Sequence, residues 1–534
     1  MKGRRVFFAF TCVLGIVIIV FACFFDRDST KITPRETLEY TDEMILQMPY
    51  FDLIAAAGEN HNLSCDIESY SFGDGYIHLI LPDNVPNKEV VVYVRDEANN
   101  LLARRVYDFN DKVMIGDWEI LLEHHNLPTI YFVSDVTDQF ELMNDSIEKD
   151  IICTGQMQLY VGKELSRQKG WTSVGRIVTN SEKKGMTASL QGRGASSWEF
   201  SKKKKPYSLR LDSACNLLGM GSNKNWNLVG NPYDVSLAKS VAFNNVAKKM
   251  GFAYQPNMEY VNLYVDGTYQ GVYTLTSKVS VDKERVALNK GDYFYRICPP
   301  QADQPIRYNS ETWTVVGEDY AVADLEYPKE ATREDLDAAY RILQDYIDAI
   351  ESGDIRRIEG VCDTRMLARY YWIQEASMNI DAWERSVYMY YTQRDGKIHM
   401  GPVWDMDLAL GSAFEKEGPQ YPEGAIYFDT PYGWKTRKAG WYRVLLKNED
   451  FIRIAREEYY NGGVREALES GIEEMREQKE ILGSDGYLNS QFYGHSNDWE
   501  IPLSHGDTYD EYYDNMIEFY RERLNWIDKE MSNL

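Results

Sequence analysis

The chain has 534 residues, which is more than one ordinary hydrophobic core accommodates, so at least two domains are expected. Its composition, 44% hydrophobic and 26% charged, is typical of a globular protein and excludes a disordered one. Lysine and arginine number 58 against 83 aspartates and glutamates, which gives a formal charge of −25. Because like charges repel, this balance argues against nucleic acid, or an anionic membrane surface, as a general partner.

The first residues predict a membrane anchor. Three basic residues precede an uncharged run over residues 6–25, which would span about 30 Å as a helix. The run is longer than the apolar part of a usual signal peptide, which favours an uncleaved anchor over a removed signal. Basic residues before the span place the N-terminus in the cytoplasm. We therefore expect a transmembrane helix within residues 1–28, a stalk over residues 29–48, and a single-pass protein of the cell membrane whose bulk is extracytoplasmic.

Cysteine and histidine give no sign of a zinc site. The cysteines beyond the anchor are widely spaced, odd in number and without a CxxC pair, so we expect buried free thiols. The histidines show no HExxH motif and no other ligand spacing. A zinc enzyme is therefore not expected.

Residues 49–125 predict a small β-rich accessory domain. Apolar runs typical of strands occur at residues 76–82, 89–96 and 101–109, and a turn signal at Asn99-Asn100 separates the last two. Short strands of this kind are typical of a small β-sandwich. No residue pattern associated with catalysis occurs in this domain.

Residues 126–534 predict one mixed α+β domain. Its first half alternates strands with one helix, which Ser236 can cap and Gly251 can end. Asp266-Gly267 predicts the two-residue turn of a β-hairpin. The second half is helical, with a capping box at Thr332 and Asp335. Further helices are predicted over residues 363–379, 441–460, 464–481 and 509–531.

Carboxylates flank a second predicted hairpin. Asp381 lies in the loop before the hairpin of residues 387–403, and Asp405 and Asp407 follow the hairpin directly. Because two antiparallel strands return the chain to where it started, Asp381 and Asp405 should lie at the same end, within reach of one ligand. Trp404 is expected to be a packed wall beside them.

The order of acid loop, hairpin and acid is the one that protein kinases use for phosphoryl transfer. There one aspartate orients the attacking hydroxyl, and the other holds magnesium against the nucleotide phosphates. Upstream, Gly192 and Gly194 supply half of a glycine-rich turn, and residues 202–205 bring a lysine run into the next strand. The helix of residues 236–250 contains no acid to pair with such a lysine, so this is not a standard kinase.

Several motifs together resemble the kinase-like family of spore coat protein H (CotH). In chain order they are LPTIYF, GRGASSW, KKPYSLRL, YDVSLAKSVAFNNVAKKMGF, VNLYVDGTYQGVYTL, NIDAWERSVYMYY and GPVWDMDLALG, which lie within residues 127–415. WYRVLLKNEDF and YRERLNWID resemble the helical end of the family. The resemblance implies an atypical protein kinase-like, two-lobed fold that binds ATP and Mg²⁺ and phosphorylates Ser or Thr of a protein substrate.

The resemblance also implies roles for five residues. Asp381 of the NID motif would be the catalytic base or a second metal contact. Asp405 of the WDMD motif would be the principal metal ligand, with Asp407 a weaker candidate for which capping of the next turn is an equally good explanation. Lys205 of KKPY and Arg193 of GRG are the candidates for phosphate contacts.

Three positions depart from the family pattern. Family members commonly have Asn where this chain has Ala195, and many have Asn where this chain has Ser386. The hairpin after Gly271 often ends in an acid, where Ser277 stands here. Because losing that carboxylate would weaken nucleotide or metal binding, an inactive pseudokinase is one alternative.

Two other functions stay open at this point. A pseudokinase or surface scaffold would bind partners through the β-rich domain, and an extracytoplasmic location favours it because ATP is scarce outside cells. A glycoside hydrolase would also use a pair of acids and aromatic side chains. It leaves the lysine run and the glycine turn unexplained.

Overall fold

The computed structural model describes residues 118–534 apart from residues 176–184, 200, 202, 298–304, 309–320, 412–414, 417–423 and 494–505, together with the strands that precede residue 118. The predicted anchor at residues 1–28 and the predicted stalk at residues 29–48 lie outside the described residues. Within the described part, no helix is both long and apolar enough to cross a bilayer.

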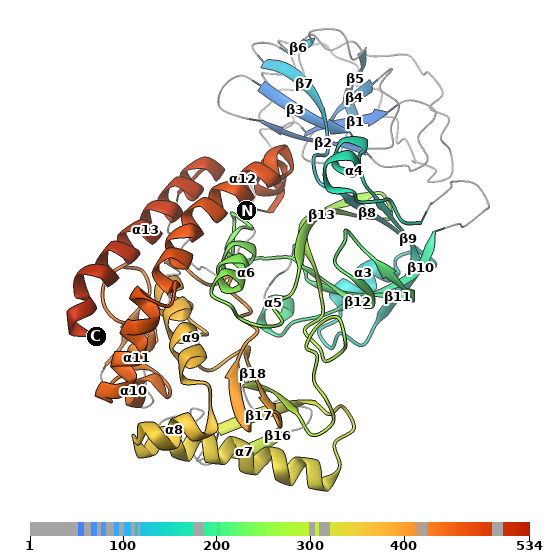
Figure 1. The fold of residues 1–534 in the computed structure, drawn as a ribbon. Helices are drawn as coiled ribbons and strands as arrows, with labels where there is room; N and C mark the ends of the chain where they lie inside the picture. Colours follow the sequence, from blue (N-terminus) through green and yellow to red (C-terminus); the bar gives the residue numbers. More distant parts are fainter. Residues whose placement is uncertain are drawn as a thin grey trace, which may run out of the picture.

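The described part of residues 49–125 consists mostly of strands, while its being a separate domain stays a prediction (Figure 1). They are β1 (Asp52–Ala57), β2 (Asp66–Ser71), β3 (Tyr76–Leu81), β4 (Val90–Arg95), β5 (Leu101–Tyr107), β6 (Val113–Ile115) and β7 (Trp118–His124). The strands pair in the order β5-β4-β1-β2-β3-β7-β6, with β3 and β7 parallel. The start of β2 pairs with β1 and its later residues pair with β3. Two-layer sandwich packing stays a prediction, because most side chains of this domain lie outside the described residues.

A closed barrel follows, which the sequence patterns did not predict. Its strands pair in the order β10-β11-β12-β14-β13-β8-β9. They are β8 (Thr129–Ser134), β9 (Ile152–Tyr160), β10 (Met186–Gly192), β11 (Tyr207–Asn216), β12 (Ser222–Val229), β13 (Met258–Val265) and β14 (Thr268–Ser277). The barrel closes where β8 pairs in parallel with β13, so residues more than a hundred positions apart in the sequence lie side by side. Its interior is apolar and includes Trp198, Trp226 and Leu228.

Four helices lie beside the barrel strands: α3 (Gln139–Asp145), α4 (Lys163–Lys169), α5 (Ser196–Glu199) and α6 (Lys239–Lys249). The predicted turn at Asp266-Gly267 is confirmed, with both residues at positive φ as a type I′ turn requires. The predicted N-cap of α6 at Ser236 is wrong by two residues, because the helix begins at Lys239 with Ala238 as its N-cap. Asp234 supplies the acceptor there, because its carboxylate accepts the backbone N–H of Lys239 at 3.0 Å.

The second half combines a five-stranded sheet with the remaining helices (Figure 1). The sheet has the order β16-β17-β15-β18-β19, formed by β15 (Tyr293–Ile297), β16 (Pro305–Tyr308), β17 (Ala321–Tyr327), β18 (Val387–Thr392) and β19 (Lys397–Met400). A short pair, β20 (Glu415–Lys416) and β21 (Ile426–Tyr427), stands apart. The helices are α7 (Arg333–Ser352), α8 (Ile355–Val361), α9 (Thr364–Ser377), α10 (Tyr442–Leu445), α11 (Glu449–Tyr460), α12 (Val464–Tyr493) and α13 (Tyr509–Glu530).

Helix boundaries in this half follow their capping residues. The capping box of Thr332 and Asp335 is confirmed at the start of α7. The predicted single helix over residues 441–460 is wrong, because Asn448 begins a new helix by accepting the backbone N–H of Asp450 and Phe451. The helix predicted over residues 464–481 is longer than expected and continues through a bend to Tyr493.

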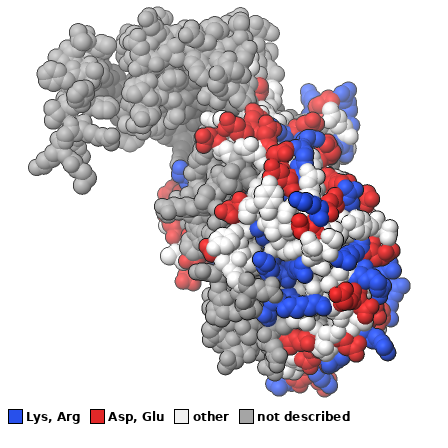
Figure 2. Space-filling view, turned by 90° about the vertical axis from the view of Figure 1, so that its left-hand side faces the viewer, with Lys and Arg blue, Asp and Glu red and all other residues white. Residues whose placement is uncertain are grey.

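The fold class is therefore mixed α+β, as predicted, with a barrel on one side and a helix-rich part on the other (Figure 1). One large apolar cluster holds the helix-rich part together and includes Trp372, Trp441 and Tyr520. The description of this arrangement as a kinase-like, two-lobed fold stays a prediction. Figure 2 shows one face of the molecule, on which acidic and basic side chains lie interspersed.

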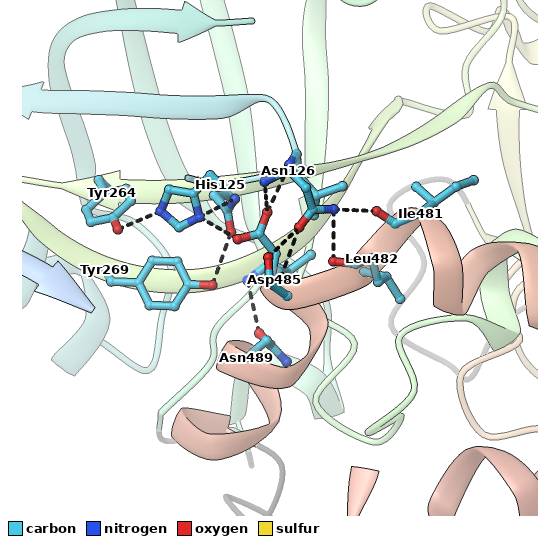
Figure 3. A network of polar contacts seen from close by, with 12 residues as sticks. His125, Asn126, Tyr264, Tyr269, Ile481, Leu482, Asp485 and Asn489 are labelled. Carbon is cyan, nitrogen blue, oxygen red and sulfur yellow. Dashed lines mark hydrogen bonds and ion pairs between the residues drawn. The ribbon is translucent and has the colours of Figure 1, made fainter. Parts of the chain in front are cut away.

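The bend in α12 is held by the segment that joins β7 to β8 (Figure 3). Gly483 leaves helical geometry, with φ 46° and ψ −136°, so backbone groups on either side lose their helical partners. The Asn126 side chain replaces both kinds of partner. Its amide nitrogen donates to the carbonyls of Ile481 and Leu482 at 2.7 and 3.1 Å, and its oxygen accepts the backbone N–H of Asp485 at 3.2 Å.

Asp485 completes this attachment (Figure 3). Its carboxylate accepts the backbone N–H groups of Asn126 and Leu127 at 3.0 and 2.9 Å, and it contacts Nδ1 of His125 at 2.5 Å. One turn further on, the Asn489 side-chain oxygen accepts the backbone N–H of Val272 in β14 at 2.9 Å. These bonds attach the C-terminal helices to the barrel, and so they help to fix the two sides of the cleft described next.

Candidate active site in the cleft beside the barrel

The hairpin of β18 and β19 brings the acid-bearing segments together, as predicted. Its strands pair in antiparallel register from Thr392 with Lys397 at the turn to Met389 with Met400 near the open end. Beyond the last pair, the backbone N–H of Gly401 donates to the carbonyl of Tyr388 at 2.8 Å. The segments before β18 and after β19 therefore begin from the same end of the hairpin.

Direct hydrogen bonds join these two segments. The Asn379 amide donates to the backbone carbonyl of Asp405 at 3.2 Å, and the Ser386 hydroxyl donates to Oδ2 of Asp405 at 2.8 Å. Asn379 also accepts the backbone N–H of Asp381 at 3.2 Å. The predicted proximity of Asp381 and Asp405 is thereby confirmed.

The backbone at this place is strained. Ser386 has φ 53° and Asp405 has φ 65°, in the left-handed region that residues other than glycine rarely adopt. Such strain persists only where surrounding contacts hold it, and it is concentrated at functional sites. Here the side chain of one left-handed residue bonds the side chain of the other, so the two conformations support each other.

A cavity of about 400 Å³ contains the predicted acids and one of the predicted cations. That volume lies within the range of small-molecule sites. Its walls include Arg193, Gly194, Asp381, Asp405 and Asp407. A second cavity of about 280 Å³ shares Arg193 and Gly194 with the first, so the two form neighbouring parts of one cleft.

Trp404 lines both cavities and also packs against the buried cluster around Phe294 and Tyr388. The expectation of a packed wall is therefore met. Gly194 of the glycine turn also lines both cavities. Gly194 has φ +81°, which glycine adopts without strain, and a Cβ atom at Gly192 would collide with the Trp198 ring at 2.6 Å.

The acids interact strongly with one another. The pKa of Asp407 lies well above its usual range, first because of burial and then because of the negative charges of Asp405, Asp234 and Asp381. A cation in the cavity would relieve this repulsion. Lys239 of α6 is one nearby cation whose charge acts in that direction.

Arg193 is the second cation close to the acids. Burial lowers its pKa, while Asp405, Tyr388 and Asp407 oppose that change. Its guanidinium makes no hydrogen bond to any residue in the described ranges. A guanidinium has five N–H donors, and this one lines a polar cavity, which suits a ligand with several anionic oxygens.

The donor set suits magnesium held together with a nucleotide. Among the residues that the structure describes, no three His, Cys, Asp or Glu side chains are grouped to hold a metal by themselves. Magnesium usually takes only one or two carboxylates and completes its octahedron with water and substrate phosphates. Asp405 and Asp407 supply that number of carboxylates, and the Arg193 side chain lines the same cavity.

None of the lysines at 203–205, the described part of the lysine run, lines these walls, so a phosphate contact by Lys205 stays a prediction. Its ammonium donates to the carbonyl of Trp198 at 3.2 Å and lies 4.2 Å from the centre of that indole ring. Lys205 is not among the residues that line either cavity. The neighbouring Lys204 is buried and donates to the side-chain oxygen of Asn489, between the rings of Tyr273 and Tyr493.

Other cations that the sequence patterns missed line the cleft. Lys278 lines the second cavity, Arg385 lines the first, and Arg296 lines both. Arg296 is bound to Asp324 at 2.8 Å, whereas Lys278 has its pKa lowered by burial and by neighbouring positive charge. Arg296 and Lys278 lie outside the motifs named above, whereas Arg385 lies within NIDAWERSVYMYY. Arg385 could have been noticed because it lies four residues after Asp381 in the same loop.

The three departures from the family pattern have different positions. Ala195 lines the first cavity, so the cavity wall lacks the side-chain amide that Asn would place there. Ser386 keeps a contact with Asp405 through its hydroxyl. Ser277 ends β14, is buried, and lines neither cavity, although the next residue, Lys278, lines the second.

The comparisons with known proteins agree with the sequence motifs. The sequence profile of a family described as CotH kinase protein matches residues 190–527. The matched range contains every residue named above as a cavity wall. No match was found among curated proteins.

Proposed function

The chain belongs to the CotH kinase protein family, and from this we propose that it is an atypical protein kinase. The proposed reaction transfers the γ-phosphate of ATP, with Mg²⁺, to Ser or Thr of a protein substrate. The observation that carries the proposal is one cavity whose walls include Asp381, Asp405, Asp407 and Arg193. Phosphoryl transfer requires this combination, because nucleophile, metal and phosphate must meet at one point.

Each residue has a proposed role. Asp381 accepts or orients the proton of the attacking hydroxyl. Asp405, with Asp407 beside it, holds the cation, which neutralises charge on the phosphate oxygens when it is bound. Arg193 donates hydrogen bonds to phosphate oxygens, and its charge opposes that of the acids. Trp404 and Tyr388 supply the flat apolar surface that a nucleobase needs.

The charges of the cleft favour this reaction over glycoside hydrolysis. A neutral glycan requires a pair of acids but no group of cations. Here Arg193, Lys278 and Arg296 line the cleft together with the acids. A triphosphate uses both signs of charge, because its metal binds the carboxylates and its oxygens bind the cations.

One observation favours the alternative of a pseudokinase or scaffold. The Ser386 hydroxyl donates a hydrogen bond to one carboxylate oxygen of Asp405 at 2.8 Å. Many family members have Asn, with a side-chain amide, in place of Ser386. A metal must share Asp405 with this hydroxyl, which would weaken its binding.

Two measurements separate these functions. ATP with magnesium should raise the melting temperature of the wild type but not of Asp405→Ala, because a ligand stabilises only the state that binds it. Labelled phosphate should reach a protein substrate such as myelin basic protein or casein, and Asp381→Ala should abolish the transfer. Asp337→Ala, which removes an exposed carboxylate of α7, is the matched control. Nucleotide binding without transfer would favour the pseudokinase, and hydrolysis of a glycan would favour the glycosidase.

We further propose that residues 1–28 anchor the protein in the cell membrane and that the bulk is extracytoplasmic. The support is the uncharged run of residues 6–25 with basic residues before it. Protease added to intact cells should then remove the domain beyond the anchor. Protection of that domain until the cells are lysed would contradict this topology.

A further inference from the structure

A third cavity, of about 560 Å³, lies on the barrel and shares no lining residue with the cleft. Its walls come from the end of α4 and the following loop, the turn between β11 and β12, and the start of β13. The side chains that matter for its chemistry are Lys169, Trp171, Asn216, Asn257 and Glu259. Lys169 and Trp171 precede the range matched by the CotH kinase profile, whereas Asn216, Asn257 and Glu259 lie within it, so the cavity joins residues from inside and outside the matched range.

Among the described residues that line this cavity, Glu259 is the only one with a carboxylate. It makes no hydrogen bond and no ion pair with any residue that the structure describes. Burial raises its pKa from 4.5 to about 7, against the opposing positive charges of Lys169 from α4 and Lys248 from α6. The Lys248 ammonium donates to the side-chain oxygen of Asn257 at 3.3 Å, and the negative charge of Glu474 in α12 opposes the lowering of its pKa by burial. A desolvated carboxylate without a direct partner is costly, and a contacting cation would remove most of that cost.

Trp171 gives the cavity an aromatic wall. A Cβ atom added at Gly219 would lie only 3.5 Å from the indole nitrogen, so the absence of a side chain there keeps this edge of the ring accessible. The indole already makes a cation–π contact, because the ammonium of Lys169 lies 5.8 Å from its ring centre. Trp171 and Glu259 together provide what a cationic group on an apolar stem requires.

We propose that this cavity binds an arginine or lysine side chain of a protein or peptide partner. Glu259 serves as the counter-ion, Trp171 packs against the apolar stem, and the Asn216 amide donates to a backbone carbonyl of the partner. The site is independent of the proposed kinase cleft. Lys169 is the group that the incoming cation displaces from the indole.

The test is calorimetric titration of the full chain with Nα-acetyl-arginine amide at pH 8. We expect a Kd of about 1–10 mM for the wild type, as suits one anchored side chain. Glu259→Gln should weaken binding at least tenfold, and the variant should fold because removing the charge relieves desolvation. Glu164→Gln, which removes an exposed carboxylate of α4 bound to Arg167, should leave the affinity unchanged.

Two further results sharpen the test. Wild-type affinity should fall between pH 8 and pH 6 as the Glu259 carboxyl gains a proton, and Glu259→Gln should show no such change. Lys169→Ala should strengthen binding, because it removes a competing like charge. Equal binding of Nα-acetyl-glutamate amide, unchanged affinity in Glu259→Gln, loss of binding in Lys169→Ala, or no binding at 50 mM would each overturn the proposal. Phosphate transfer is measured separately, so failure here leaves the proposed kinase function untouched.

Discussion

Two regions were expected to form the nucleotide site, and among their described residues only those of one region line the cleft. They are the acid end of the β18–β19 hairpin and the lysine run of residues 202–205. Both were expected to face one nucleotide, yet the acids line the cleft, whereas neither Lys204 nor Lys205 does. A hairpin has a register, so residues flanking its two strands are forced to the same end. A run of like residues has no such constraint. Lys204 donates a hydrogen bond to the Asn489 side chain, whereas Lys205 donates one to the Trp198 carbonyl.

The largest expected effect concerns the acid end. Asp381→Asn should lower the rate of phosphate transfer by about 100-fold to 10,000-fold, which is the usual contribution of a general base. Binding of ATP with magnesium should change little, because the variant keeps the shape of the side chain. Single-turnover transfer and nucleotide titration on the same preparation measure both. An active Asp381→Asn variant would separate this acid from the chemistry.

The next effect concerns stability at the lysine run. Lys204→Ala should lower the free energy of unfolding by about 2–4 kcal/mol, the usual cost of truncating a long buried side chain. Lys204→Met should cost less, because it keeps the stem between the two tyrosine rings and removes a cation whose pKa burial has already lowered. Urea unfolding measures both. Lys205→Ala is the control, and an equal loss in that variant would contradict the distinction between neighbouring lysines.

The third prediction compares Arg193 with Lys205 as the cation that contacts the nucleotide phosphates. Arg193→Ala should weaken binding of ATP with magnesium by about 10-fold to 100-fold, or roughly 1.4–2.8 kcal/mol. Lys205→Ala should change the affinity less than twofold, because its ammonium lies outside the cavity walls. Fluorescence titration with a labelled nucleotide measures both variants. If their order were reversed, the family-based expectation for Lys205 would be restored.

His399, on the β18–β19 hairpin away from its acid end, should make the stability of the protein depend on pH without affecting the cleft. Burial alone would lower the pKa of His399, but Asp363 and Asp395 outweigh it and the net shift is upward. A raised pKa of this kind adds stability below the ordinary histidine pKa of about 6.5, and that stability is lost as pH rises through the folded-state value. His399→Gln should therefore destabilise the protein at pH 6 and have no effect at pH 9, as urea unfolding would show. A similar loss of stability at both pH values would mean that the imidazole acts only by packing on Tyr390.

The smallest effect concerns Ser386. Asn tolerates left-handed backbone well, so Ser386→Asn should fold at this position with φ 53°. An amide oxygen is a better magnesium ligand than a hydroxyl shared with Asp405, and we expect a two- to fivefold gain in magnesium affinity in the presence of ATP. Titration of magnesium against ATP-dependent melting gives the answer. Weaker binding would show that the hydroxyl suits this site better than the family residue.

Local patterns predicted much of this structure. The capping box of Thr332, the turn at Asp266-Gly267 and the meeting of Asp381 with Asp405 each depend on residues within about 25 positions. Asn448 gave a local signal too, since an Asn before two acids is typical of a helix start, and the single predicted helix overlooked it.

The remainder depends on contacts that no local pattern contains. The barrel closes through the pairing of β8 with β13, and the bend in α12 is satisfied by Asn126, more than 350 residues earlier in the chain. Arg296 and Lys278 line the cleft only because β15 and the end of β14 converge there. A lone cation in a strand looks the same in the sequence whether it faces solvent or a phosphate.

The most direct test of the central claim is a crystal structure of the chain with a non-hydrolysable ATP analogue and manganese, whose anomalous signal locates the cation. We predict one peak within about 2.5 Å of an Asp405 carboxylate oxygen, with the γ-phosphate between that cation and Asp381. A cation bound elsewhere, or a nucleotide whose γ-phosphate points away from Asp381, would contradict the account.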